Sequence, residues 1–305
     1  METAARRMAK WRVRGGVLEL GARTLVMGIV NVTPDSFSDG GLYLDSEAAV
    51  RHALKLLGEG ADLLDLGAES TRPGSHAGGA EAEVSADEEL ARLLPVIAGI
   101  KEARPDAVLS VDTYKAATAR AALVAGAAIV NDVSGFAWDP ALAQVCAEAR
   151  CGVVLMHARG RPEEWRTLPA LTPDEMMADV RAGLQKSLDV AERAGIGLDA
   201  VVLDPGYGFG KRGAANYALL ARQQELLALG RPLMAGLSRK SFLGQALTAI
   251  DGGSAPAAHE RETASLAAMT AAILHGASIV RVHAVQAAVE AARIADACSA
   301  FSPLG

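Results

Sequence analysis

Short runs of apolar residues recur along this chain of 305 residues, and most are followed by a loop and then by a helical pattern rich in alanine and leucine. Runs that are apolar throughout are typical of strands in a parallel sheet covered on both faces. The pattern therefore predicts repeated strand–helix units. The predicted strands are Leu25–Val30, Leu63–Leu66, Val108–Val111, Ala128–Val130, Val153–Met156, Val201–Leu203, Pro232–Ala235 and Ser278–Val282.

Helix starts are marked between these runs. Thr172-Pro173-Asp174-Glu175 combines an N-cap residue, a proline at the first helical position and a glutamate three residues after the cap. Ser85-Ala86-Asp87-Glu88 and Asp139-Pro140 predict similar starts. The strand ends run from Asn31 to Arg281 with roughly 36 residues per unit.

This rhythm predicts the fold class α/β, as a (β/α)8 TIM barrel, whose usual size is about 250 residues. An open, doubly wound sheet is the alternative. Ahead of the first unit, Trp11–Arg14 and Val17–Leu20 flank Gly15-Gly16, which predicts a β-hairpin that covers the bottom of the barrel. We expect one domain over residues 1–305, with the hairpin at about 11–20 and the barrel at about 25–299.

Composition narrows the class of protein. Aromatic residues are only 4% of the chain, which disfavours an all-β fold, and the net charge of −6 disfavours a nucleic-acid-binding surface. The 3 cysteines form no C-x-x-C pair, and no window has the length of a membrane span. We expect a folded cytoplasmic protein that binds neither nucleic acid nor membrane.

Function in such a barrel lies at the carboxyl ends of the strands. A polar group there stands where the apolar core stops. Asp112 and Asn131, each taken singly, are equally compatible with helix caps. Several strands that end this way at one face favour a shared site. The candidates are Asn31, Asp112, Asn131, His157, Asp204, Lys240, Arg281 and His283.

Two segments point to an anionic ligand. Ser238-Arg239-Lys240-Ser241 follows the seventh strand, and Arg281-Val282-His283 closes the eighth, which are the places where barrel enzymes often bind phosphate. The alternative is ordinary surface charge. The Lys211-Arg212-Gly213 turn either touches a ligand or is solvated.

Two long polar loops follow the first two strands, at residues 31–41 and 69–85. Loops of this length on a barrel are usually lids or substrate clamps, the alternative being plain surface connections.

Eight ordered blocks, one near each predicted strand end, resemble those of the dihydropteroate synthases. The resemblance covers essentially the whole chain, although Ser75–Val84 is longer than the corresponding family loop. The blocks are Asn31–Gly41 (NVTPDSFSDGG), Asp65–Gly74 (DLGAESTRPG), Ser110–Thr113 (SVDT), Val130–Val133 (VNDV), Leu155–His157 (LMH), Asp204–Lys211 (DPGYGFGK), Gly236–Phe242 (GLSRKSF) and Arg281–His283 (RVH).

The resemblance implies a transferase that joins 6-hydroxymethyl-7,8-dihydropterin pyrophosphate to 4-aminobenzoate in folate synthesis, with Mg²⁺, as a homodimer. The predicted catalytic residues are Asp35, Lys240 and Arg281, and our hypothesis for Asp35 is that its carboxylate stabilises a cation-like pterin methylene. The implied pterin pocket is Asp112, Asn131, Asp204 and Lys240, with Asn31 linked to Mg²⁺. The pyrophosphate side is Thr71, Arg72, Arg281 and His283, and the aminobenzoate side, where sulfonamides compete, is Phe37, Arg72, Pro73 and Ser241.

Two other functions share the same barrel. A corrinoid-dependent pterin methyltransferase domain has the carboxylate and asparagine pocket but no use for a pyrophosphate site, so Ser238–Ser241 and Arg281–His283 count against it. A non-catalytic pterin-binding paralogue would keep the pocket and lose the reaction.

Overall fold

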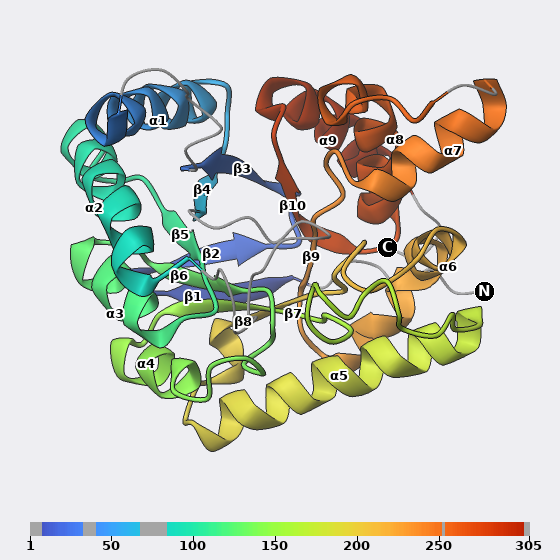
Figure 1. Ribbon diagram of the computed structural model, residues 1–305, viewed down its shortest axis with the longest axis horizontal. Helices are drawn as coiled ribbons and strands as arrows, with labels where there is room; N and C mark the ends of the chain where they lie inside the picture. Colours follow the sequence, from blue (N-terminus) through green and yellow to red (C-terminus); the bar gives the residue numbers. More distant parts are fainter. Residues whose placement is uncertain (1–7, 33–40, 68–83, 252–253, 302–305) are drawn as a thin grey trace.

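Eight parallel strands close into a barrel, and helices form a ring around it (Figure 1). The structure is a computed structural model, and it describes residues 8–32, 41–67, 84–251 and 254–301. The predicted TIM barrel with an N-terminal hairpin is confirmed. The strand order around the barrel is β10-β3-β4-β5-β6-β7-β8-β9, so every neighbour in space is also a neighbour in sequence until β10 closes against β3.

The barrel strands start and end within one or two residues of the predicted runs. They are β3 (Leu25–Asn31), β4 (Leu63–Gly67), β5 (Leu109–Asp112), β6 (Ile129–Asp132), β7 (Gly152–Met156), β8 (Val201–Asp204), β9 (Leu233–Ala235) and β10 (Ala277–Val282).

The helices between the strands cover the outside of the barrel. They are α1 (Gly41–Gly58), α2 (Ala86–Ala103), α3 (Ala116–Ala125), α4 (Leu142–Ala149), α5 (Pro173–Arg193), α6 (Ala214–Arg222), α7 (Ser241–Asp251), α8 (Glu262–Leu274) and α9 (Val285–Ala300), with short 3₁₀ helices at Leu198–Ala200, Gln223–Leu229 and Ala258–Glu260. None of the described helices is both long and apolar enough to cross a membrane.

Two of the three predicted helix starts are confirmed. Ser85 and Thr172 form reciprocal capping boxes with the residues three positions later, at the starts of α2 and α5. At Asp139-Pro140 the helix α4 starts later than predicted, at Leu142, but Asp139 still caps the turn before it, because its Oδ1 accepts from the N–H of Ala141 at 2.9 Å and its carbonyl oxygen from that of Leu142 at 3.1 Å. The other carboxylate oxygen of Asp139, Oδ2, accepts from the backbone N–H of Ala116, the first residue of α3, at 2.7 Å.

The hairpin closes the bottom of the barrel, as predicted. It comprises β1 (Ala9–Val13) and β2 (Gly16–Leu20), and its turn is Arg14-Gly15, one residue earlier than the predicted Gly15-Gly16, because Gly16 pairs with Val13. Trp11 is fully buried, and its indole N–H donates to the carbonyl of Ala200 at 2.9 Å. The hairpin side chains pack against the lower residues inside the barrel, which include Leu63 and Ile129.

Candidate functional site

The inside of the barrel changes from apolar to polar between two successive inward positions of the strands. The lower positions belong to the apolar cluster that packs against the hairpin, and they include Leu63, Ile129, Val202 and Ile279. Because side chains on one face of a strand recur every second residue, the next inward positions lie two residues further along. Those positions carry ionisable or amide side chains, which are Asp65, Asn131, Asp204 and Arg281.

Asp65 lies at the centre of this polar layer, and sequence reasoning did not select it. Its side chain is fully buried, and one oxygen, Oδ2, accepts from Asn131 Nδ2 at 2.9 Å and from Arg281 Nε at 2.6 Å. The other oxygen, Oδ1, has no partner among the described residues. The missed signal was a carboxylate between Leu64 and Leu66, on the same strand face as Leu63.

Asp112 faces the same guanidinium from the next strand. Its Oδ2 accepts from Arg281 Nη2 at 2.7 Å, so Arg281 bridges two carboxylates. Burial, opposed by the positive charge of Arg281, raises the pKa of Asp112 to about 7. Within the described residues, Asp112 and Asn131 bond to other strand ends, as a shared site requires and as helix caps would not.

Asp204 ends β8 and is held by the turn that follows it. Its Oδ1 accepts from the N–H of Gly206 at 2.7 Å, and burial raises its pKa. Gly206 has a φ of 69°, and a Cβ there would lie 2.0 Å from the carbonyl oxygen of His157. Only glycine fits this turn, which therefore fixes the direction of the Asp204 carboxylate.

Lys240 lies above the ring of Phe209, with Nζ 3.9 Å from the ring centroid. Burial is the largest influence on it and lowers its pKa to about 8, with the positive charge of Arg281 acting in the same direction. A lysine in such surroundings loses its proton more readily than an exposed one. The site thus contains a carboxylate and an ammonium whose pKa values both lie near neutrality.

His283 and Ser238 connect the ends of the last two strands. The Ser238 hydroxyl lies 2.9 Å from His283 Nδ1, and its oxygen also accepts from the His283 backbone N–H at 3.3 Å. The two segments predicted to bind an anion are thereby in direct contact.

In the turn Lys211-Arg212-Gly213, Arg212 is exposed but Lys211 is not solvated. It is buried, and its ammonium donates to the carbonyl oxygens of His157, Gly206 and Phe209 at 2.9, 2.8 and 3.2 Å. It therefore joins the loops after β7 and β8. His157 itself is buried, which lowers its pKa well below the usual value, and it packs against Gly183 of α5.

The remaining predicted residues divide into two groups. Asn31 is half-buried at the end of β3, and Ser241 is exposed at the start of α7. The others lie outside the described residues, and they are Asp35, Phe37, Thr71, Arg72 and Pro73. In the described part of the chain, no cluster of three or more His, Cys, Asp or Glu side chains is placed to hold a metal ion.

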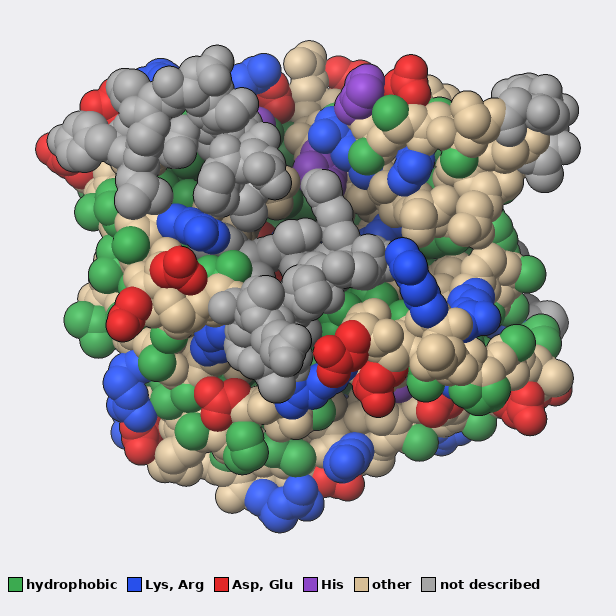
Figure 2. All heavy atoms as spheres, viewed as in Figure 1, with side chains coloured by type: hydrophobic (Ala, Val, Ile, Leu, Met, Phe, Trp, Pro, Cys, Tyr) green, Lys and Arg blue, Asp and Glu red, His purple; other side chains and the backbone are tan. Residues whose placement is uncertain are grey.

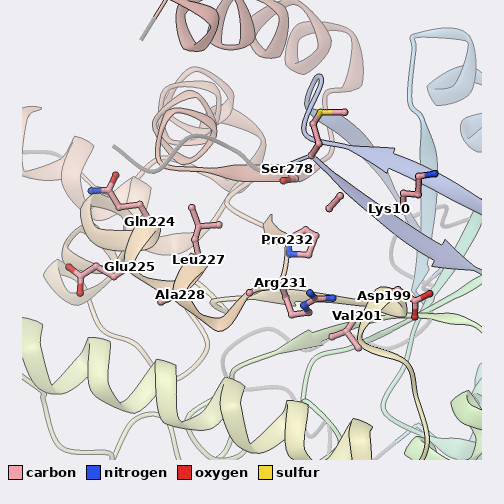
Figure 3. Close-up of a pocket in the computed structure, with 13 residues that line it drawn as sticks. Lys10, Asp199, Val201, Gln224, Glu225, Leu227, Ala228, Arg231, Pro232 and Ser278 are labelled. Atoms are coloured by element: carbon pink, nitrogen blue, oxygen red, sulfur yellow. The ribbon is translucent and has the colours of Figure 1, made fainter. Parts of the chain in front are cut away.

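Acidic and basic side chains are mixed over the described part of the face shown in Figure 2. A separate cavity of about 500 Å³ lies at the bottom of the barrel, away from the strand ends (Figure 3). It is bounded by β1, the 3₁₀ helix Gln223–Leu229 and the starts of β8 and β10. Leu227, Val201 and Pro232 contribute apolar walls, and Asp199 and Arg231 contribute charge.

Comparison with known proteins gives consistent matches. Residues 27–283 match the family model of pterin binding enzymes. A dihydropteroate synthase from Mycobacterium leprae is 45% identical over 278 residues, covering 89% of this chain and 92% of the relative. The structure of Yersinia pestis dihydropteroate synthase with a sulfonamide drug has a TM-score of 0.84 at 40% identity, covering 96% of this chain and 100% of that one. The Xanthomonas albilineans enzyme in complex with 7,8-dihydropteroate has a TM-score of 0.80 at 40% identity, with the same coverage.

Proposed function

The chain belongs to the dihydropteroate synthase family of pterin binding enzymes, and from that premise we propose that its reaction takes place among the polar strand ends at the mouth of the barrel. It is a transferase of folate synthesis that condenses 6-hydroxymethyl-7,8-dihydropterin pyrophosphate with 4-aminobenzoate to give 7,8-dihydropteroate and pyrophosphate. The observation that carries the assignment of the site is Arg281 held between the carboxylates of Asp65 and Asp112.

The pterin ring would lie against Asp112, Asn131, Asp204 and Lys240. A pterin presents several N–H donors along one edge, and carboxylates accept such donors in pairs. Asp204 is already oriented by Gly206, and the raised pKa values of Asp204 and Asp112 reflect burial that a bound ring with matching donors would offset. The Lys240 ammonium would donate to the ring carbonyl and a ring nitrogen.

The pyrophosphate would lie on the side of Arg281 and His283. Both alternate along the same extended segment, and Ser238 joins that segment to the loop that carries Lys240. Cations and hydrogen-bond donors at this point stabilise charge that develops on a leaving group. Thr71 and Arg72, proposed for the same side, lie outside the described residues.

We also propose Mg²⁺ as the cofactor, held by Asn31. An amide oxygen is a hard ligand, and Mg²⁺ is commonly bound through one or two protein oxygens together with substrate phosphates and water. A single donor at the end of β3 fits that mode, and the described residues offer no cage of carboxylates for a resident metal ion. When bound, the ion would neutralise charge on the pyrophosphate.

The condensation breaks the bond between the pterin methylene carbon and the pyrophosphate oxygen and forms a bond from that carbon to the amine nitrogen of aminobenzoate. Pyrophosphate leaves with the bonding electron pair and takes up the proton that the amine nitrogen loses. Ser241 is exposed beside Lys240 and would contact the aminobenzoate. Four other residues proposed for this step lie outside the described part of the chain. They are Phe37, Arg72 and Pro73, proposed to contact the aminobenzoate, and Asp35, proposed to stabilise the methylene cation.

One experiment tests this function. The protein is incubated with the pterin pyrophosphate, 4-aminobenzoate and Mg²⁺, and pyrophosphate release is measured with and without the amine. Release that requires 4-aminobenzoate is the expected result. Pterin binding without release would instead indicate a non-catalytic paralogue, and methyl transfer from a methylated folate would indicate the methyltransferase.

We propose that the enzyme is a homodimer joined through α8 and α9. Leu274 of α8 and Ile294 of α9 are large apolar residues that are 46% and 67% exposed, and Phe301 follows directly after α9. Light scattering after gel filtration should give twice the chain mass, and Ile294→Glu should give the monomer. A monomer for the unaltered protein would refute the proposal.

A cytoplasmic location is also proposed. The three cysteines, Cys146, Cys151 and Cys298, are all unpaired, which suits a reducing compartment. Fractionation of the source cells with an antibody against the protein tests this location.

A further inference from the structure

Asp65 is a fully buried charged group of the mouth, and the roles proposed above assign it no function. Its side chain is fully buried, and β4 places it inside the barrel two residues beyond Leu63. The adjacent strand places Ser110 directly opposite, and the Ser110 hydroxyl has no partner among the described residues. The carboxylate therefore depends on the two donors that reach it from other strands.

The first donor is the side-chain amide of Asn131. An ionised carboxylate only accepts hydrogen bonds, so the atom that faces Asp65 Oδ2 at 2.9 Å must be the amide nitrogen. This contact fixes the orientation of the amide, and the carbonyl oxygen of Asn131 is then left for a ligand. Asn131 would thus act as an acceptor toward a ring N–H of the pterin.

The second donor is Arg281, whose guanidinium has five N–H groups in a rigid plane. The Nε–H is taken by Asp65 at 2.6 Å, and one Nη2 hydrogen is taken by Asp112 at 2.7 Å. The three remaining N–H groups are not committed to described residues. Because the fork is planar, fixing Nε on Asp65 also fixes the directions of those three.

A buried carboxylate without a cation is strongly unfavourable, so Arg281 cannot leave Asp65 without a large cost. Asp112, whose pKa is raised to about 7, is the partner more easily released to a ligand. The two carboxylates therefore differ in function although they hold the same guanidinium.

We propose that Asp65 is a positioning residue for the condensation, an inference that rests on the function proposed above. It holds Arg281 so that its free N–H groups face the pyrophosphate, and it holds Asn131 so that its carbonyl oxygen faces the pterin. Asp65 itself touches neither substrate.

The test compares two ligands, the pterin pyrophosphate and the pterin alcohol that lacks the phosphates, by their dissociation constants. The dissociation constant of the alcohol divided by that of the pyrophosphate reports the pyrophosphate contacts alone, and this quotient is the ratio used below. Asp65→Asn keeps the shape and removes the charge, so the ratio should fall by about 10- to 100-fold, the range expected for hydrogen bonds to a charged group. General damage to the fold would raise both constants together and leave the ratio unchanged.

Two further variants complete the comparison. Asp132→Asn removes a carboxylate that is equally buried but that bonds to the N–H groups of Ser134 and Phe136, so it should keep the ratio of the unaltered protein. Arg281→Met should lower the ratio, and adding Asp65→Asn to it should change the ratio by less than about 3-fold, because coupled residues are not additive.

The proposal is overturned if Asp65→Asn keeps the full ratio while Arg281→Met loses it. A ratio near one in the unaltered protein would refute the proposed function instead. Should Asp65→Asn not fold, side-chain NMR of the unaltered protein decides the matter. The Arg281 Nε–H, assigned by its loss in Arg281→Met, should remain protected from exchange when the pterin pyrophosphate binds. Free exchange in that complex would overturn the proposal.

Discussion

The two ends of this barrel both contain charged residues, but they treat those charges in opposite ways. At the bottom, Asp199 accepts from Nε and Nη2 of Arg12 at 3.0 and 3.1 Å, and this pairing lowers the pKa of Asp199. Glu225 is paired with Arg222 at 2.7 Å in the same manner, with the same effect on its pKa. At the mouth, burial raises the pKa of Asp112 to about 7 and lowers that of Lys240 to about 8.

The difference shows why the cavity at the bottom is not the reactive site. Its acidic groups are partnered in ways that favour their charged forms, as expected of surface ion pairs that support a fold. At the mouth, ionisable groups are buried even though burial disfavours their charged forms, and the acceptor Asp65 Oδ1 has no partner among the described residues. Groups kept in such states concentrate at functional sites, because a ligand can offset the cost.

Exchanging one arginine at each end gives the largest expected contrast. Arg281→Met should lower kcat/KM for dihydropteroate formation by about 10³-fold, because it removes a donor to the leaving group and strands two buried carboxylates. Arg231→Met, in the wall of the bottom cavity, should change kcat/KM by less than about 2-fold. Similar losses in both variants would remove the distinction between the two ends.

Shortening the buried side chain of the hairpin should lower the free energy of unfolding and leave kcat unchanged. Trp11→Ala removes a fully buried side chain and its bond to Ala200, so unfolding in urea should show a loss of about 3 kcal/mol. The kcat of the folded fraction should stay within about 2-fold of the original. Val17→Ala, on the exposed side of the same hairpin, serves as the control and should cost less than about 0.5 kcal/mol.

The pH dependence of kcat/KM should follow the titration of Asp112 and Lys240 at the mouth of the barrel. Activity should fall below about pH 7, where Asp112 gains a proton and stops accepting from the pterin, and above about pH 8, where Lys240 loses its charge. Lys240→Arg should remove only the basic limb, because a guanidinium stays charged there. An unchanged basic limb in that variant would assign it to another group.

The same raised pKa has a predictable sign for stability. Because Asp112 binds its proton more tightly in the folded state than in the unfolded one, its contribution to stability should increase as the pH falls from about 7 toward 4.

The smallest expected effect lies on the outer ring. The hydroxyl oxygen of Thr172 caps α5 by accepting from the Glu175 N–H at 3.3 Å. Thr172→Ala removes this cap and should lower the free energy of unfolding by about 1 kcal/mol. Activity should not change. A loss of activity larger than the loss of folded protein would show that α5 reaches the site.

Much of the fold could be predicted because it rests on local regularities. The recurring apolar runs predicted the barrel strands within one or two residues, and the capping boxes at Ser85 and Thr172 marked their helices. At Asp139-Pro140 the helix starts later, at Leu142, and the Asp139 side chain binds the N–H of Ala116 in another helix as well as that of Ala141. A local motif cannot show that its side chain will also serve a second helix nearby.

The candidate site was predicted only in part. Asp112, Asn131 and Arg281 stood out at strand ends, and the structure brings them together. Asp65 was missed because it lies inside an apolar strand, and the Lys211 carbonyl contacts were missed because backbone partners leave no mark in a sequence.

By itself, then, the sequence determined the type and order of the elements, the end of the barrel where polar groups gather, and the family. These follow from periodicity and from residue types at strand ends, which are properties of neighbouring positions. Only the tertiary structure decided that Arg281 meets Asp65 across 216 positions and Asp112 across 169. Closing the barrel brings β10 beside β3 and turns the inward faces of all its strands toward one axis, and it is this closure that makes separate strand-end residues into one site.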